Sequence, residues 1–191
     1  MRAAFSVVLL SATLPALSLA QEAAELETPK TRLEAFAAQD GVVIIRAFSR
    51  IGAVRGQDGS IVVVESKEFT NAGTGKREYG ISMMVKAGSR LEREHTSYVD
   101  FDEITPLLTA LEYLGNVDGS ATALDHFQAD YRTRGDLVIA AFSTESGTMA
   151  AVSSGILGKT TASLALADLG RIRELIQSGY ATLDKLRAGQ K

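Results

Sequence analysis

Three carboxylates lie close together in the sequence, at Asp100, Asp102 and Glu103. Carboxylates act as general acids and bases, and their oxygens bind hard cations. The spacing does not fit a calcium loop, which alternates oxygen ligands over about twelve residues around a fixed glycine. Acidic residues are also favoured at helix starts, where they cap amide groups and interact with the helix dipole. We therefore interpret the group as helix-capping residues and keep a carboxylate-dependent hydrolase as an alternative.

The chain contains two histidines, His95 and His126, and histidine titrates near neutral pH without help from its surroundings. No metal-binding spacing such as H-x-H or H-E-x-x-H joins them, and no G-x-S-x-G or S-x-x-K nucleophile motif accompanies either one. Charged neighbours from Glu92 to Glu94 favour a solvated strand face for His95. The sequence therefore predicts no catalytic residue and no metal site, with His95 or His126 as the base if the chain is a hydrolase.

Gly158-Lys159-Thr160 is similar to the end of a phosphate-binding loop. That motif needs a glycine at the position of Ser153, and it must lead from a strand into a helix whose amide groups bind the phosphates. Residues 161–166 have the pattern of a strand instead. We expect a hairpin turn here, and the sequence predicts no cofactor.

The composition excludes several classes of function. At 46% hydrophobic the chain has enough apolar material for a core, and without cysteine it can form no disulfide, thiol nucleophile, lipoprotein anchor or cysteine-ligated metal site. If Arg2 is removed, 19 basic residues oppose 23 acidic ones, a net charge of −4. Such a surface has no general attraction to nucleic acid or anionic lipid, so we expect no nucleic-acid partner.

The first twenty residues have the three-part layout of a secretory signal peptide. Met1-Arg2 supplies a positive charge, Ala3–Leu14 is uncharged and apolar, and Ser18-Leu19-Ala20 is a small-x-small ending. We expect cleavage between Ala20 and Gln21. An uncleaved membrane anchor is the alternative, but Ser, Thr and Pro15 dilute the apolar stretch. The sequence thus predicts an exported, bacterial, periplasmic or secreted protein with no transmembrane segment after cleavage.

The 171 residues from Gln21 onward begin with a linker, residues 21–40, that contains a short helix at 31–38. Short apolar runs separated by glycine turns follow, and the alternation of Tyr79, Ile81, Met83 and Val85 is typical of a half-buried strand. We expect a first half, 41–117, with strands at 42–48, 60–64, 79–85 and 91–99 and a helix at 102–114. Because its run is dense in β-branched residues, we expect the 42–48 strand to be buried.

The second half, 118–191, repeats this plan. We expect strands at 127–133, 136–142, 148–152 and 161–166, followed by a helix at 167–187. That helix has apolar residues at helical spacing over too few heptads for a coiled coil, so we expect it to pack on a sheet rather than to act as an assembly surface. The predicted class is α+β, with antiparallel sheets, two principal helices and one shared globular domain.

The two long helices begin with a matching pattern. Val99-x-Phe101-x-Glu103-Ile104-x-x-Leu107 aligns without gaps with Leu164-x-Leu166-x-Asp168-Leu169-x-x-Ile172. Two tandem units of four strands and a helix resemble the whirly-type fold of single-stranded nucleic-acid-binding proteins. The resemblance implies two antiparallel sheets, a helix behind each, and extended strands bound on the sheets. This chain departs from such binding surfaces because it lacks tryptophan and is negatively charged. The chain is also similar to uncharacterised exported bacterial proteins, which implies no activity.

These observations favour a non-catalytic binding or interaction module of the cell envelope. We expect its partner surface to be an exposed sheet edge or face, since a strand such as Val42–Phe48 can recruit another strand. The partner is an unidentified envelope protein or a small ligand. Two alternatives remain: a carrier of small molecules or lipids with an apolar cavity between its sheets, and the hydrolase.

Overall fold

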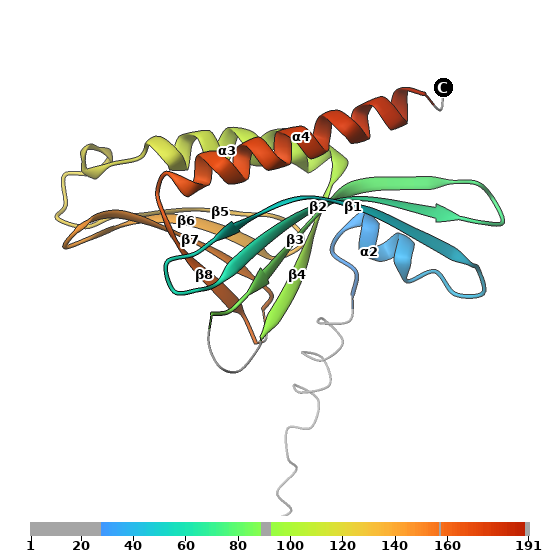
Figure 1. The fold of residues 1–191 in the computed structure, drawn as a ribbon, viewed down its shortest axis with the longest axis horizontal. Coiled ribbons are helices and arrows are strands. Elements are labelled where there is room, and N and C mark those ends of the chain that lie inside the picture. The colour runs from blue at the N-terminus through green and yellow to red at the C-terminus, as the bar shows by residue number, and fades with distance from the viewer. Residues whose placement is uncertain (1–27, 89–92, 157, 190–191) are drawn as a thin grey trace, which may run out of the picture.

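The computed structural model describes residues 28–88, 93–156 and 158–189 (Figure 1). The signal peptide predicted for residues 1–20, with its cleavage site between Ala20 and Gln21, lies outside the described residues. Of the helices in the described part, none combines the length and the apolar character needed to span a membrane.

The described residues form two four-stranded antiparallel sheets and three α-helices, which confirms the α+β class. The first sheet has the order β1-β2-β3-β4 and the second the order β5-β6-β7-β8. In chain order the elements are α2 (Arg32–Ala37), β1 (Ile44–Arg55), β2 (Ile61–Asn71), β3 (Arg77–Lys86), β4 (Glu94–Asp100), a 3-10 turn (Phe101–Glu103), α3 (Ile104–Asn116), a 3-10 turn (Gly119–Ala121), β5 (Gln128–Arg132), β6 (Leu137–Thr144), β7 (Gly147–Ser154), β8 (Thr160–Ala165) and α4 (Asp168–Ala188).

All eight predicted strands are present, but β1 and β2 are longer than expected. β1 continues to Arg55 through an irregularity in its pairing with β2 between Arg50 and Gly52. An extra residue of this kind bends a strand and increases its twist. Gly52 lies under α4, where a Cβ atom would stand 2.6 Å from the Leu175 side chain. The glycine therefore lets the bent strand pass close beneath the helix.

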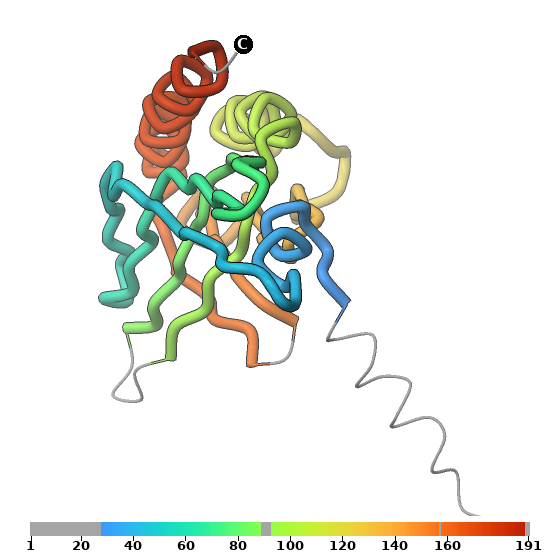
Figure 2. Tube along the Cα trace, turned by 90° about the vertical axis from the view of Figure 1, so that its right-hand side faces the viewer, coloured from blue at the N-terminus to red at the C-terminus, as the bar shows by residue number. Residues whose placement is uncertain are grey.

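Each long helix packs mainly on the sheet of the other half. α3 follows the first sheet along the chain but contacts β5 and β6, whereas α4 follows the second sheet and contacts β1, β2 and β3. The two helices lie side by side over the sheets (Figures 1 and 2). The resemblance to whirly-type proteins implied a helix behind each sheet, and here the two helices are exchanged. The duplicated plan of four strands and a helix stays a prediction.

One hydrophobic cluster contains residues of both sheets and of both long helices. Tyr79, Ile81, Met83 and Val85 are all at most 4% exposed, which confirms that this face of β3 is buried. These residues share one face of the first sheet with Ser66, over which α4 passes at Gly179. Gly80 and Ser82 on the other face are buried as well, so the centre of β3 is not half-buried as expected. A second, smaller cluster of Leu33, Phe36 and Phe69 joins α2 to the opposite face of the same sheet.

Candidate functional site

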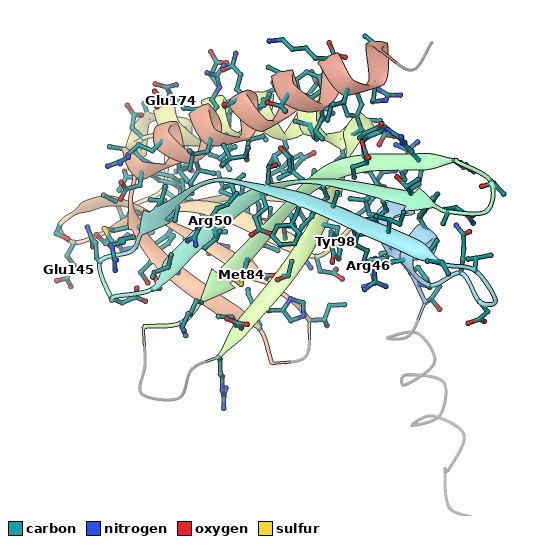
Figure 3. All side chains as sticks on the ribbon, turned by 45° about the vertical axis from the view of Figure 1, so that its right-hand side comes forward. Arg46, Arg50, Met84, Tyr98, Glu145 and Glu174 are labelled. Atoms are coloured by element: carbon teal, nitrogen blue, oxygen red, sulfur yellow. The ribbon has the colours of Figure 1, made fainter. Side chains whose placement is uncertain are left out.

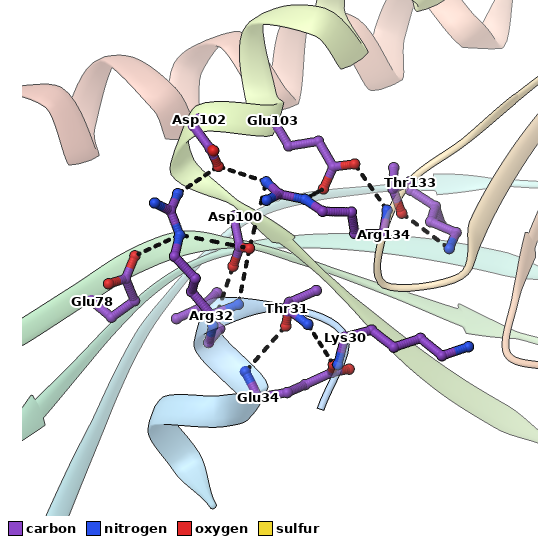
Figure 4. Close-up of polar contacts among 12 residues, drawn as sticks. Lys30, Thr31, Arg32, Glu34, Glu78, Asp100, Asp102, Glu103, Thr133 and Arg134 are labelled. Atoms are coloured by element: carbon purple, nitrogen blue, oxygen red, sulfur yellow. Dashed lines mark hydrogen bonds and ion pairs between the residues drawn. The ribbon is translucent and has the colours of Figure 1, made fainter. Parts of the chain in front are cut away.

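The structure brings the three predicted carboxylates together with two arginines from distant segments. Asp100 ends β4, and Asp102 and Glu103 belong to the 3-10 turn that follows (Figure 4). They face Arg32, the first residue of α2, and Arg134 in the turn between β5 and β6. The cluster therefore connects α2, the first sheet and the second sheet.

Asp100 is fully buried and holds the start of α2. Its carboxylate accepts the backbone N–H groups of Arg32 at 2.9 Å and of Leu33 at 3.2 Å. It also lies 3.5 Å from Arg134 Nη2 and 3.8 Å from Arg32 Nε. A helix of six residues is marginal alone, and Thr31 supplies only part of its capping. Asp100 thus caps a helix, but a distant one instead of the helix that follows it.

Asp102 does not cap α3, and this prediction is wrong. Neither the 3-10 turn nor α3 has a side-chain cap, because the Asp102 carboxylate accepts hydrogen bonds from Arg32 and, at 2.6 Å, from Arg134. Burial raises the pKa of Asp102, but the hydrogen bond from Arg134 and the charges of both arginines outweigh it and lower the pKa overall. The same hydrogen bond raises the pKa of Arg134. Asp102 therefore stays ionised over the neutral range.

Glu103 is nearly buried and does not cap α3 either. It accepts the Arg134 backbone N–H at 2.9 Å and the Arg134 Nε–H at 3.4 Å. Glu78 on β3 completes the cluster through an ion pair with Arg32 at 3.6 Å. The pKa of Glu78 is raised overall. Burial is the main cause, the charge of Asp100 adds to it, and the charge of Arg32 partly offsets it.

The cluster suits a structural role better than acid–base chemistry. A general base needs a pKa near the working pH and access to substrate, whereas Asp102 has a lowered pKa and Asp100 is fully buried. Asp100, Asp102 and Glu103 are all paired with arginine. Within the described segments no group of three or more Asp, Glu, His or Cys side chains could hold a metal ion. The geometry gives the hydrolase alternative no support.

His95 lies on a face that is only partly solvated, because β4 packs against β7 and the residue is half-buried. His95 Nδ1 lies 2.9 Å from the hydroxyl of Ser154, which in turn lies 2.7 Å from the hydroxyl of Ser97. Ser97 and Ser154 each lie two residues from a buried valine, Val99 and Val152, and therefore on the same inward face of their strands. A serine at an otherwise apolar inward position is the signal that could have indicated this pair.

The His95–Ser154 distance matches a base and its nucleophile, but the surroundings do not. Ser154 is fully buried, so its hydroxyl is closed to substrate. Among the described residues no carboxylate hydrogen-bonds to the His95 ring, so a third group that would orient the base is missing there. His95 also lines an open groove of about 610 Å³ beside α2, together with Arg46 and Tyr98. His126 is exposed, as expected for a surface histidine.

The glycine motif at Gly158 is a hairpin turn, as predicted. Gly158 has a φ of +68°, which favours glycine, and Thr160 begins β8 instead of a helix. The turn offers no helix N-terminus to a phosphate group.

β1 is an outer strand of its sheet and is largely exposed, so the predicted burial of residues 42–48 is wrong. Val43, Ile45 and Phe48 are 69%, 54% and 66% exposed. α4 covers this strand near Gly52, beyond the segment that carries them. Figure 3 shows Arg46, on the same strand, on the sheet face away from α4. A dense apolar run does not distinguish a central strand from an outer one, and this explains the error.

A second apolar surface lies between α3 and β5. It is an open groove of about 630 Å³ whose lining includes Pro106, Tyr113, Leu114 and Tyr131. The carrier alternative expected a cavity between the sheets, but the core cluster fills that space. The groove lies instead at the edge of the second sheet, between α3 and the outer strand β5.

Comparison with known proteins finds no matching family model, no matching curated protein and no matching solved structure. The likeness to whirly-type proteins therefore rests on the order of the elements, and the function rests on the geometry of the chain itself.

Proposed function

We propose that this chain is an exported, non-catalytic binding module that recruits an extended partner segment along β1. The observation that carries the proposal is the outer position of β1 together with the exposure of its apolar side chains. The other outer strand of the same sheet, β4, is covered by α2 and β7. β1 is thus the edge of this sheet that offers room for another strand.

The backbone of an outer strand is a template for a further strand, since alternate N–H and C=O groups point away from the sheet. Proteins often block such edges with proline, bulges or a covering element. Ile44–Arg50 contains no proline and precedes the irregularity at Gly52. Among the described residues, β1 pairs with β2 alone. An extended segment of matching length can therefore add to it in regular pairing.

The side chains of β1 give this edge its selectivity. Ile45 and Phe48 point to opposite faces of the sheet because their positions differ by an odd number of residues. Phe48 lies under the ammonium group of Lys67, 4.7 Å from the ring centroid. Arg46 lies 5.8 Å from the centroid of Phe69. A partner strand with apolar residues on both faces, and an aromatic or acidic residue beside Arg46, fits this surface.

Export is part of the proposal and is supported by the sequence of residues 1–20. Its test is the mass of the mature protein from an envelope fraction, compared with the mass from the cytoplasm. A chain that begins at Gln21 and is enriched in the envelope supports export. A full-length chain in the cytoplasm contradicts it.

The binding proposal is tested with a phage-displayed library of random nonapeptides selected on the purified chain. We expect enriched peptides with alternating apolar residues, whose affinity falls at least about tenfold with the pair Ile45→Asp and Phe48→Asp. The matched control is Ala123→Asp with Leu124→Asp, two exposed apolar residues away from β1. Peptides that bind the β1 variant as tightly as the original chain contradict the proposal.

The groove between α3 and β5 supports a second candidate function, a carrier of small apolar ligands. Its volume of about 630 Å³ lies within the range of small-molecule sites, and two tyrosines and a leucine contribute to its lining. Long-chain fatty acids are a suitable probe in a thermal-shift measurement. We expect a raised melting temperature that Ala110→Trp, which fills the groove, abolishes and that Ala123→Trp leaves unchanged. No shift with any chain length contradicts this candidate.

A further inference from the structure

We propose that the segment recruited by β1 is β1 of a second copy of this chain. The two strands pair antiparallel about a two-fold axis through Ala47, so that two four-stranded sheets become one continuous sheet. This inference rests on the proposed function, because it assigns the partner of the same edge. It follows from the order of charged, aromatic and small residues along Ile44–Arg50.

A two-fold axis perpendicular to the sheet restricts the register. It places opposite each other the residues that lie equally far from the axis on either side, and their side chains share a face. With the axis at Arg46, the two copies of Arg46 would lie opposite each other. With the axis at Phe48, Arg46 would lie opposite Arg50 of the partner copy. Both registers place like charges directly across the interface, which destabilises a sheet.

Other centres fit the strand poorly. An axis at Ile45 extends the pairing to residues before β1 begins, and an axis at Ser49 extends it into the irregularity at Gly52. An axis at Ala47 uses the whole regular segment Ile44–Arg50. In this register no arginine lies opposite an arginine of the partner copy. Ala47, the smallest side chain of the segment, lies at the axis.

The Ala47 register also continues a pattern already present in the sheet. Across β1 and β2, Arg46 is opposite Phe69 and Phe48 is opposite Lys67, and each cation lies near its neighbour's ring. In the dimer Arg46 stands opposite Phe48 of the partner copy. The row then reads Phe69, Arg46, Phe48, Lys67, with the last two from the partner copy, and symmetry repeats it in the opposite direction. Aromatic and cationic side chains alternate through four strands, so each inner side chain has a favourable neighbour on both sides.

The helix-side face fits this register too. There Ile45 lies opposite Ser49 of the partner copy, and the two Ala47 side chains meet at the axis. The exposed Ile45 gains a small neighbour, and no charge is buried on this face. The irregularity between Arg50 and Gly52 ends the pairing on each side, and the isologous contact closes on itself, which favours a dimer over a fibre.

The absence of cysteine from the sequence allows a direct test by single-cysteine cross-linking. In the proposed register Ala47→Cys places two thiols opposite each other at the axis, so mild oxidation gives a disulfide-linked dimer on a non-reducing gel. Ala53→Cys is the matched control, because Ala53 is exposed on the same strand beyond the irregularity. Equal cross-linking of the two variants, or none in either, overturns the register.

Two variants with opposite charges at the axis, Ala47→Lys and Ala47→Glu, test the register independently. Their self-association is measured by sedimentation equilibrium on the chain of residues 21–191. We expect a dimer of the original chain that weakens at least about tenfold in Ala47→Lys and in Ala47→Glu, since each variant opposes like charges. Mixing the two variants restores a dimer that contains one of each. Ala53→Lys leaves the dimer intact.

The failure of this inference is distinguishable from failure of the proposed function. A monomeric original chain that still binds selected peptides along β1 overturns the second copy as partner and leaves the binding module standing. A dimer that persists in Ala47→Lys uses another surface and also overturns the inference. An original chain that neither self-associates nor binds selected peptides overturns the proposed function as well.

Discussion

β1 and β4 are the two outer strands of one sheet, and they differ in how far other segments of the chain cover them. The inward and terminal residues of β4 have partners from other segments: His95 and Ser97 bond to Ser154, and Asp100 bonds to α2. From Ile45 to Arg50 every β1 residue is exposed. β4 thus connects the two halves, whereas β1 is the edge that we propose for an external contact.

The segments that cover β4 are far from it in the sequence. The turn between β5 and β6 approaches so closely that a Cβ atom on Gly135 would lie 2.2 Å from the backbone carbonyl oxygen of Tyr98. Next to this glycine, Arg134 reaches Asp100. Substitutions along β4 should therefore change stability, whereas substitutions along β1 should change association. The five predictions below test that difference.

The largest effect is expected for Asp100→Ala. The substitution removes a buried carboxylate that accepts two backbone N–H groups and faces two arginines. We expect a loss of about 3–4 kcal/mol in the free energy of unfolding, measured by urea denaturation. Asp130→Ala, at an exposed position of β5, is the control. A loss below about 1 kcal/mol would show that the cluster does not hold β4.

Gly135→Ala tests the close approach of the second sheet's turn to β4. The added methyl group would overlap the carbonyl oxygen of Tyr98, which belongs to the backbone and cannot rotate away. We expect a loss of about 2 kcal/mol in unfolding free energy. Gly119→Ala has nothing within 4 Å of the added atom and should leave the stability nearly unchanged. Equal unfolding midpoints for both variants would contradict the packing seen here.

Ser154→Ala tests the polar contact between β4 and β7. It leaves His95 and Ser97 without their shared hydroxyl partner in a largely buried setting, and we expect a loss of about 1 kcal/mol. The His95 ring should also change its NMR chemical shifts. Ser146→Ala, in an exposed turn, serves as the comparison. Unchanged His95 shifts in Ser154→Ala would exclude the hydrogen bond.

The fold was largely predictable from local patterns, whereas the polar contacts were not. The alternation from Tyr79 to Val85 and the glycine turns are local signals, and the strands they predict are present. The pairing of Asp100 with Arg134 joins two halves of the chain, and no local pattern specifies it. The same limit explains the error at residues 42–48, since β-branched density indicates a strand but says nothing about its place in the sheet. The exchange of α3 and α4 between sheets is likewise a tertiary property.

A smaller, pH-dependent effect is expected for Asp102→Asn at the exposed side of the cluster. The folded pKa of Asp102 lies below its ordinary value of 3.8, so its stabilising contribution is present above about that pH and is lost as pH falls through the folded pKa. The side chain is 55% exposed, so we expect a difference of about 0.5 kcal/mol at neutral pH. The difference between the two chains should shrink in denaturation series run below pH 4. A constant difference across the series would assign the effect to packing.

The smallest effect on stability is expected for Phe48→Ser on β1, and this substitution separates the two edges most sharply. Phe48 is 66% exposed, and the Lys67 ammonium group that it contacts keeps its ion pair with Glu65, so the loss of the ring should change the free energy of unfolding by less than about 0.5 kcal/mol. The same substitution should weaken association along β1, because it removes the ring that Arg46 of a second strand would meet. Urea denaturation and sedimentation of one preparation measure both quantities. If Phe48→Ser instead lowers stability by as much as Ser154→Ala while association is unchanged, β1 contributes to the fold as β4 does, and the contrast between the two edges disappears.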